Sequence, residues 1–83
     1  MTKQQVIEEV FAELRRAEAK FPGWPDDVVH AAAIVAEESG ELVQASLDLY
    51  YGRGNREQVI KEAVHTTAMG FRFLFNMADE VQP

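Results

Sequence analysis

The chain has 83 residues, a length that corresponds to one small domain. Eight Lys and Arg residues against 14 Asp and Glu residues give a formal net charge of −6 at pH 7. This acidic balance disfavours binding to a nucleic-acid polymer, which requires a basic surface, and binding to an anionic membrane. The absence of cysteine excludes disulfides, thiolate zinc sites and cysteine nucleophiles. The composition suits a domain that binds cations.

The sequence shows no signal for export or for a membrane. After Met1 the chain opens with the polar residues 2–5, and it lacks the apolar stretch of a signal peptide. No apolar run approaches the roughly 20 residues of a membrane-spanning helix. We therefore expect a cytoplasmic protein with no membrane partner.

Apolar residues recur at helical spacing along most of the chain, and no segment alternates with a period of two. This pattern predicts a single all-α domain over residues 1–83. Breaks at residues 21–25 and 52–55 divide it into three helices. The first is expected from about Lys3 to Lys20, with Thr2 as its N-cap and Gln5 completing a capping box.

The second helix is expected from about Asp26 to Tyr51. Pro25 and the two aspartates after it suit its first turn, where the positive end of the helix dipole favours carboxylates. The third is expected from about Arg56 to Asp79, with Asn55 as its N-cap.

The second half of the third helix, residues 63–77, is apolar or small on nearly every face. A helix with this pattern is buried on all sides, and a three-helix protomer cannot surround it. We therefore expect a homodimer or homotetramer, in which the two long helices assemble with partner subunits into a helical bundle.

Two pairs of potential metal ligands have helical spacing. Glu38 and Glu41 lie three residues apart on the second helix, and Glu62 and His65 lie three apart on the third. If these helices are antiparallel neighbours, the two pairs can face each other and offer ligands to a divalent cation. The alternative is that the glutamates lie on solvated helix faces. Gly40, which costs about 1 kcal/mol in a helix relative to alanine, indicates close approach of another helix or a ligand.

These residues also carry a family resemblance. Glu37-Glu38-Ser39-Gly40-Glu41, followed by Glu62-Ala63-Val64-His65, resembles the Glu-Glu-x-x-Glu and Glu-x-x-Asp motifs of the MazG-like all-α nucleoside triphosphate pyrophosphohydrolases. The Phe-Pro-x-Trp-Pro segment at 21–25, the Glu-Leu-Val-Gln-Ala run at 41–45 and Lys61 are also similar to that family. The similarity covers about residues 20–75 and fits a short, phage-type member.

The resemblance implies a helical oligomer that hydrolyses a (deoxy)nucleoside triphosphate to the monophosphate and pyrophosphate, in house-cleaning of the nucleotide pool. It implies Mg²⁺ as cofactor, with Glu38, Glu41 and Glu62 as ligands. Glu37, Glu38 and Glu41 form the implied catalytic set, in which Glu37 supports or activates the attacking water. His65 stands in the fourth ligand position, where the family has Asp, and an imidazole suits Mn²⁺, Zn²⁺ or Ni²⁺ better than Mg²⁺. We therefore expect Mg²⁺ or Mn²⁺.

Four further residues are candidates for nucleotide binding, and each has an alternative. Trp24 can stack on a base or cover a helix pair as a hydrophobic plug. His30 can contact a base or sugar, or belong to the core or a helix cap. Lys61 can contact phosphates or lie in solvent. Arg72 lies in the apolar half of the third helix and needs an anionic partner, which is either a glutamate of another subunit or a triphosphate.

Three functions remain open on the sequence. The first is a metal-dependent nucleoside triphosphate pyrophosphohydrolase. The second is a catalytically weakened or inactive protein of the same fold that binds a nucleotide or a partner, which the histidine at position 65 favours. The third is a plain dimerising helical module with solvated glutamates.

Overall fold

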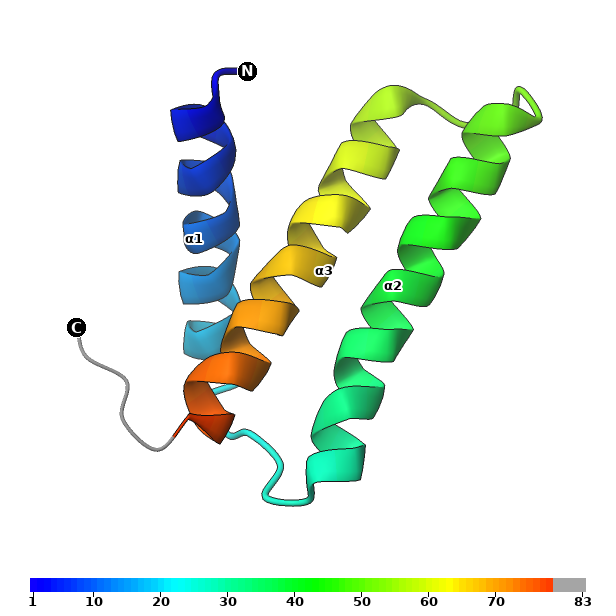
Figure 1. The fold of residues 1–83 in the computed structure, drawn as a ribbon. Helices are drawn as coiled ribbons and strands as arrows, with labels where there is room; N and C mark the ends of the chain where they lie inside the picture. Colours follow the sequence, from blue (N-terminus) through cyan, green and yellow to red (C-terminus); the bar gives the residue numbers. More distant parts are fainter. Residues whose placement is uncertain (79–83) are drawn as a thin grey trace.

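The computed structural model describes residues 1–78, which form three α-helices and confirm the all-α prediction. The helices are α1 (Lys3–Lys20), α2 (Val28–Tyr50) and α3 (Arg56–Met77). Figure 1 shows α3 in the middle, with α1 and α2 packed on either side of it. None of the three is long and apolar enough to cross a membrane. The predicted end of the third helix, Asp79, lies outside the described residues.

The helix starts follow from capping side chains. The predicted capping box is present at α1, where the Thr2 hydroxyl accepts a hydrogen bond from the backbone N–H of Gln5 and the Gln5 side chain accepts one from Thr2. At α2 the carboxylate of Asp27 accepts from the backbone N–H groups of Val29 and His30. Asp27 is therefore the N-cap, and the prediction that the second helix begins at Asp26 was wrong by two residues.

The turn between α2 and α3 matches the predicted break. Gly52 has a φ of 76°, a conformation that costs a residue with a side chain about 1–2 kcal/mol. Its N–H donates to the carbonyl of Leu49, and the N–H of Arg53 donates to the carbonyl of Asp48. These two bonds close α2 as a Schellman motif. Asn55 then caps α3 as predicted, so α3 returns antiparallel to α2 and their mid-helix side chains meet.

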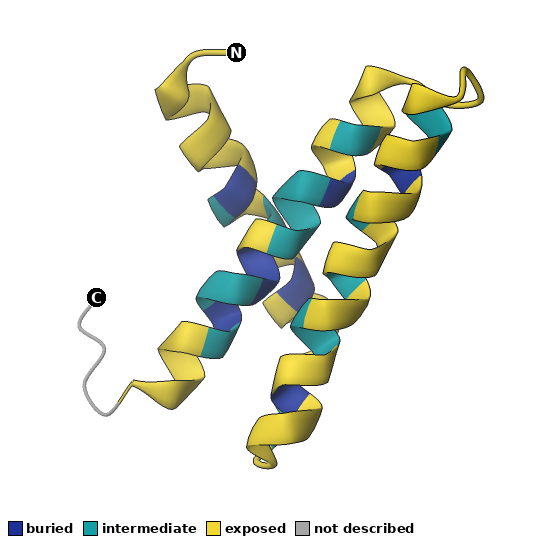
Figure 2. Ribbon diagram, turned by 45° about the vertical axis from the view of Figure 1, so that its right-hand side comes forward, coloured by how far each residue is buried: buried dark blue, intermediate teal, exposed yellow. Residues whose placement is uncertain are grey.

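The core is small and centres on α3. Figure 2 shows the buried positions concentrated where α1 and α2 meet α3. The main cluster joins α1 to α3 and consists of Val10, Leu14, Ala17, Ala68 and Met69. Helix α2 buries only two alanines, Ala31 and Ala45. Most of the surface of α2 is therefore available to solvent, a ligand or a partner.

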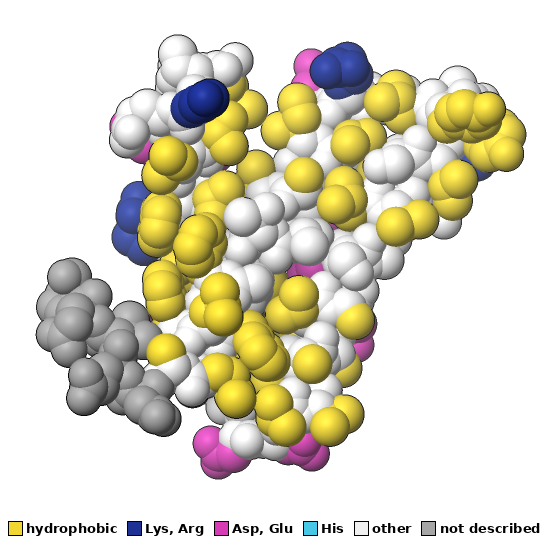
Figure 3. Space-filling model, viewed as in Figure 1, with side chains coloured by type: hydrophobic (Ala, Val, Ile, Leu, Met, Phe, Trp, Pro, Cys, Tyr) yellow, Lys and Arg dark blue, Asp and Glu magenta, His cyan; other side chains and the backbone are white. Residues whose placement is uncertain are grey.

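The second half of α3 is not enclosed within one chain. Leu74, Phe75 and Met77 are 59%, 39% and 50% exposed, and Figure 3 shows apolar side chains spread over this face of the molecule. These exposed apolar side chains are consistent with the predicted homo-oligomer, which stays a prediction.

Gly40 is not explained by packing within the chain, because a Cβ atom added there would meet nothing within 4 Å. We expect Gly40→Ala to stabilise the fold by about 1 kcal/mol through higher helix propensity. Thermal unfolding should show a melting temperature raised by roughly 4–8 °C. Gly52→Ala is the matched control, since the positive φ of Gly52 makes a loss of stability the expected result there. A lower melting temperature for Gly40→Ala would show that a partner packs against this turn of α2.

Candidate functional site

Three of the predicted ligands lie together where α2 packs on α3. Glu38 from α2 and Glu62 and His65 from α3 each offer one ligand atom, and these three atoms lie within 4.8 Å of one another. Ligands on opposite sides of a metal ion are about 4.2 Å apart when each bond is about 2.1 Å. The predicted juxtaposition of the two helices is therefore present for these three residues. Their role as ligands stays a prediction.

Two carboxylate oxygens of this cluster are buried without a hydrogen-bond partner among the described residues. Glu62 is only 7% exposed. Its Oε1 atom accepts a hydrogen bond of 3.1 Å from the Gln58 side chain, while its Oε2 atom has no partner. The Oε2 atom of Glu38 is also buried and has no hydrogen-bond partner. A buried, unpartnered carboxylate is costly, and a bound cation would remove that cost.

The surroundings of Glu38 favour its protonated form when no cation is present. Burial raises the pKa of Glu38 above its ordinary value, and the neighbouring carboxylates of Glu41 and Glu62 raise it further. His65 acts in the opposite direction, with its Nδ1 atom 3.9 Å from Glu38 Oε2. The pKa of Glu38 is therefore higher in the folded chain than in the unfolded chain. As the pH rises from the unfolded-state pKa through the folded-state pKa, the free energy of unfolding falls because Glu38 becomes ionised in the fold. A cation bound here would compete with that proton.

A third acidic residue, Glu13 of α1, reaches the cluster and was missed in the sequence. Its Oε1 atom lies 3.6 Å from Nε2 of His65. Arg16, one turn further along α1, donates two hydrogen bonds of 2.8 and 2.6 Å to the two Glu13 oxygens. These bonds lower the pKa of Glu13, burial opposes them, and the charges of His65 and Lys61 lower it further. No motif marks Glu13, because its place depends on how α1 crosses α3.

The other two predicted acidic residues are not among the three clustered ligands, although the Glu41 carboxylate neighbours that of Glu38. Glu41 is exposed and lines a shallow depression beside Glu62 and Gln58, on the surface between α2 and the start of α3. Glu37 is exposed on α2. The predicted ligand role of Glu41 and the predicted catalytic roles of Glu37 and Glu41 stay predictions.

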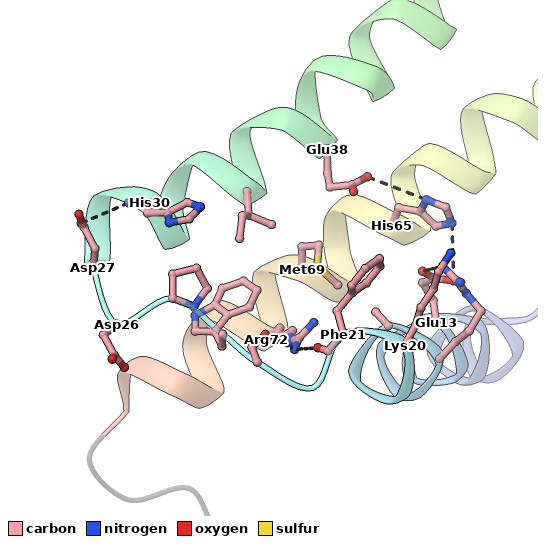
Figure 4. Close-up of a pocket in the computed structure, with 16 residues that line it drawn as sticks. Glu13, Lys20, Phe21, Asp26, Asp27, His30, Glu38, His65, Met69 and Arg72 are labelled. Atoms are coloured by element: carbon pink, nitrogen blue, oxygen red, sulfur yellow. Dashed lines mark hydrogen bonds and ion pairs between the residues drawn. The ribbon is translucent and has the colours of Figure 1, made fainter.

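A cleft of about 760 Å³ extends from the cluster along the space between α1, residues 21–27 and α2. Figure 4 shows Glu38 and His65 at one end, Asp27 and His30 at the other, and Met69 between them. Three basic side chains also line this cleft: Arg16, Lys20 and Arg72. The cleft therefore joins the acidic cluster to a basic and partly apolar surface.

Arg72 is 5% exposed and its partners are not carboxylates. Its Nη2 group donates to the carbonyl oxygens of Phe21 and Gly23, the latter at 3.0 Å. The guanidinium also lies 4.9 Å from the centre of the Trp24 ring. Within residues 1–78 no ion pair of Arg72 is present, so the predicted anionic partner is not supplied by this part of the chain. A partner subunit and a triphosphate both stay open.

The remaining nucleotide-binding candidates are placed differently from one another. Trp24 packs against the core cluster, as expected of a hydrophobic plug, and also lines the cleft. His30 is exposed and lines the end of the cleft distant from the acidic cluster. Lys61 is exposed and does not line the cleft, although its charge acts on Glu13.

Comparison of the chain with models of protein families, with curated proteins and with solved structures finds no match. A functional assignment therefore depends on the geometry of the cluster and the cleft, together with the motif resemblance.

Proposed function

We propose that the protein hydrolyses a (deoxy)nucleoside triphosphate to the monophosphate and pyrophosphate with the help of a divalent metal ion. The observation that carries the proposal is the pair of buried, unpartnered carboxylate oxygens of Glu38 and Glu62 beside His65. Glu38 and His65 border a cleft whose volume, about 760 Å³, is in the range of small-molecule sites. The resemblance to the MazG-like motifs supports the same reaction.

The donor set fits a divalent cation. Mg²⁺ is usually held by one or two carboxylates together with waters and substrate phosphates, and an imidazole makes Mn²⁺ a suitable alternative. Glu38, Glu62 and His65 would hold the ion, with Glu41 as a further predicted ligand. When bound, the ion would offset charge developing on the phosphates and lower the pKa of a bound water.

The side chains of this chain would bind and orient the substrate along the cleft. Arg16 and Lys20 lie on α1 at the cleft and would contact phosphates. Trp24 and His30 would contact the base or sugar at the end distant from the metal. Glu37, which is exposed on α2 and precedes Glu38 in the sequence, would accept the proton of the attacking water.

A second candidate function is binding of a nucleotide or a partner without turnover. His65 favours it, since the family motif has an aspartate in that position. The plain dimerising module is less well supported, because a solvated helix face does not account for buried carboxylate oxygens without partners. In each case the exposed apolar side chains of α3 would form the contact with a second copy of the chain.

The decisive experiment is a pyrophosphate-release assay over the four standard and several damaged deoxynucleoside triphosphates, with Mg²⁺ and again with Mn²⁺. We expect turnover of a subset that EDTA abolishes. Glu38→Gln should reduce the rate at least 100-fold, since it removes a ligand charge. Glu57→Gln, an exposed glutamate in the first turn of α3, is the matched control and should remain active. Nucleotide binding without pyrophosphate release with either metal would favour the second candidate.

A further inference from the structure

His65 lies between two carboxylates that come from different helices. Its Nδ1 atom faces Glu38 at 3.9 Å, and its Nε2 atom faces Glu13 at 3.6 Å. The two nitrogens therefore point in different directions, one to the acidic cluster and one to α1, as Figure 4 shows. The distance from His65 Nε2 to Glu13 is about 0.6 to 0.7 Å longer than the most common N–H···O hydrogen bond.

We propose that Glu13 is a positioning residue, which holds the His65 ring with Nδ1 toward the metal and thereby makes the site prefer an ion that binds nitrogen well, such as Co²⁺, over Mg²⁺. This inference rests on the metal site of the proposed function. It adds a residue of α1, outside both sequence motifs, to a cluster built from α2 and α3.

The chemistry of histidine ligands supports this role. An imidazole that binds a metal through Nδ1 carries its proton on Nε2, and that N–H usually donates to a carboxylate or carbonyl. Glu13 is the carboxylate that faces Nε2, and it is the acceptor that such a ligand requires. Such partners fix the orientation of the ring and increase its strength as a ligand.

Glu13 is itself held in place. Arg16 donates to both of its oxygens at 2.8 and 2.6 Å, and the Glu13 side chain is only 13% exposed. A carboxylate fixed in this way constrains the ring, whereas a mobile surface glutamate would not. Arg16 therefore acts on His65 through Glu13.

Metal preference follows from the nitrogen ligand. The affinity of a nitrogen ligand for divalent first-row metals rises from Mn²⁺ to Co²⁺, and imidazole also suits Zn²⁺, whereas Mg²⁺ prefers oxygen ligands and keeps its waters. If Glu13 no longer orients the ring, Glu38 and Glu62 can still hold Mg²⁺. Removal of Glu13 should therefore weaken Co²⁺ binding and affect Mg²⁺ binding little.

The test is to titrate the wild-type chain and the Glu13→Gln variant with Co²⁺ and with Mg²⁺. Calorimetry measures the affinity for each ion, and the visible absorption of bound Co²⁺ reports on its ligands. We expect Glu13→Gln to weaken Co²⁺ binding about 10- to 100-fold and to change the Co²⁺ spectrum, with a change below about threefold for Mg²⁺. Glu18→Gln makes the same charge change on an exposed part of α1 and should leave both affinities unchanged. In a His65→Gln background, Glu13→Gln should have no further effect on Co²⁺.

The outcomes separate the two proposals. If the wild-type chain binds neither ion, the metal site of the proposed function is wrong. If it binds Co²⁺ and Glu13→Gln keeps that affinity and spectrum, the role of Glu13 is overturned while the metal site stands. A measurement that needs no variant is the ¹⁵N NMR spectrum of labelled histidine in the Zn²⁺-bound wild type. Zinc on Nδ1 of His65 with the proton on Nε2 supports the inference, and zinc on Nε2 overturns it.

Discussion

Replacing Glu62 with glutamine is expected to abolish binding of Mn²⁺ and at the same time to stabilise the metal-free fold. Glu62 is 7% exposed, and its Oε2 atom has no partner among the described residues. The substitution keeps the shape of the side chain and removes a buried charge whose desolvation is not offset by a partner. The free energy of unfolding should therefore rise by on the order of 1–3 kcal/mol. It also removes a negative ligand from the site, so metal affinity should fall at least 100-fold.

Two measurements check this prediction on the same samples. Thermal unfolding in EDTA should give a higher melting temperature for Glu62→Gln than for the wild type. Mn²⁺ titration followed by electron paramagnetic resonance should show no bound ion. Glu57→Gln is the control, because it makes the same change at an exposed position in the first turn of α3. A carboxylate there stabilises the helix through its dipole, so we expect a small loss of stability and unchanged Mn²⁺ binding.

Either measurement can contradict the prediction. Unchanged Mn²⁺ affinity in Glu62→Gln would show that the ion, if any, is held elsewhere. A lower melting temperature in EDTA would show that the buried carboxylate has a stabilising partner, such as a cationic group of a second subunit. In that case Glu62 would serve assembly and not metal binding.

The helices and their starts could be predicted because their signals are local in sequence. Thr2 and Asn55 cap the helices that directly follow them, and the turn at Gly52 needs only the residues around it. The start of α2 was placed too early. Asp26 and Asp27 both suit a helix start, and only the backbone bonds of Asp27 to Val29 and His30 decide which one caps it.

The cluster could be predicted only in part. Spacing places Glu62 and His65 on one face of α3, and the short turn makes α2 and α3 antiparallel. The side chains of Glu62 and His65 can therefore be expected to lie near Glu38 of α2, as they do. The position of Glu13 does not follow, because it depends on the packing of α1 against α3 through Leu14 and Ala68. Spacing within α2 likewise cannot show that Glu38 faces His65 while Glu41 lines a depression on the Glu62 side of the cluster.

Arg72 shows a different limit of sequence reasoning. A buried arginine needs acceptors, and the sequence led us to expect an anion, which stays a prediction; the partners that the described residues supply are two backbone carbonyls and an aromatic ring. Backbone carbonyls of a loop carry no signature in the sequence. Their use indicates that Arg72 fixes the path of residues 21–25, which form part of the wall of the cleft.

Replacing Arg72 with methionine is therefore expected to destabilise the fold by about 2–4 kcal/mol. The carbonyls of Phe21 and Gly23 would lose their donor, and the Trp24 ring would lose the guanidinium that lies against it. The melting temperature should fall by roughly 10–20 °C. Trp24 is the one tryptophan of the chain, so its fluorescence reports directly on this loop and should shift toward the spectrum of a solvated indole.

Two further variants make the Arg72 result specific. Arg15→Met removes an exposed arginine from α1 and should change neither the melting temperature nor the fluorescence. Arg72→Lys keeps the charge but lacks the planar fork that reaches two carbonyls, so an intermediate loss is expected. An unchanged Trp24 spectrum in Arg72→Met would show that residues 21–25 are held by other contacts. Nucleoside triphosphate that stabilises the wild type but not a folded Arg72→Lys would identify the substrate as a further partner of the guanidinium, because ligand binding stabilises only the state that binds it.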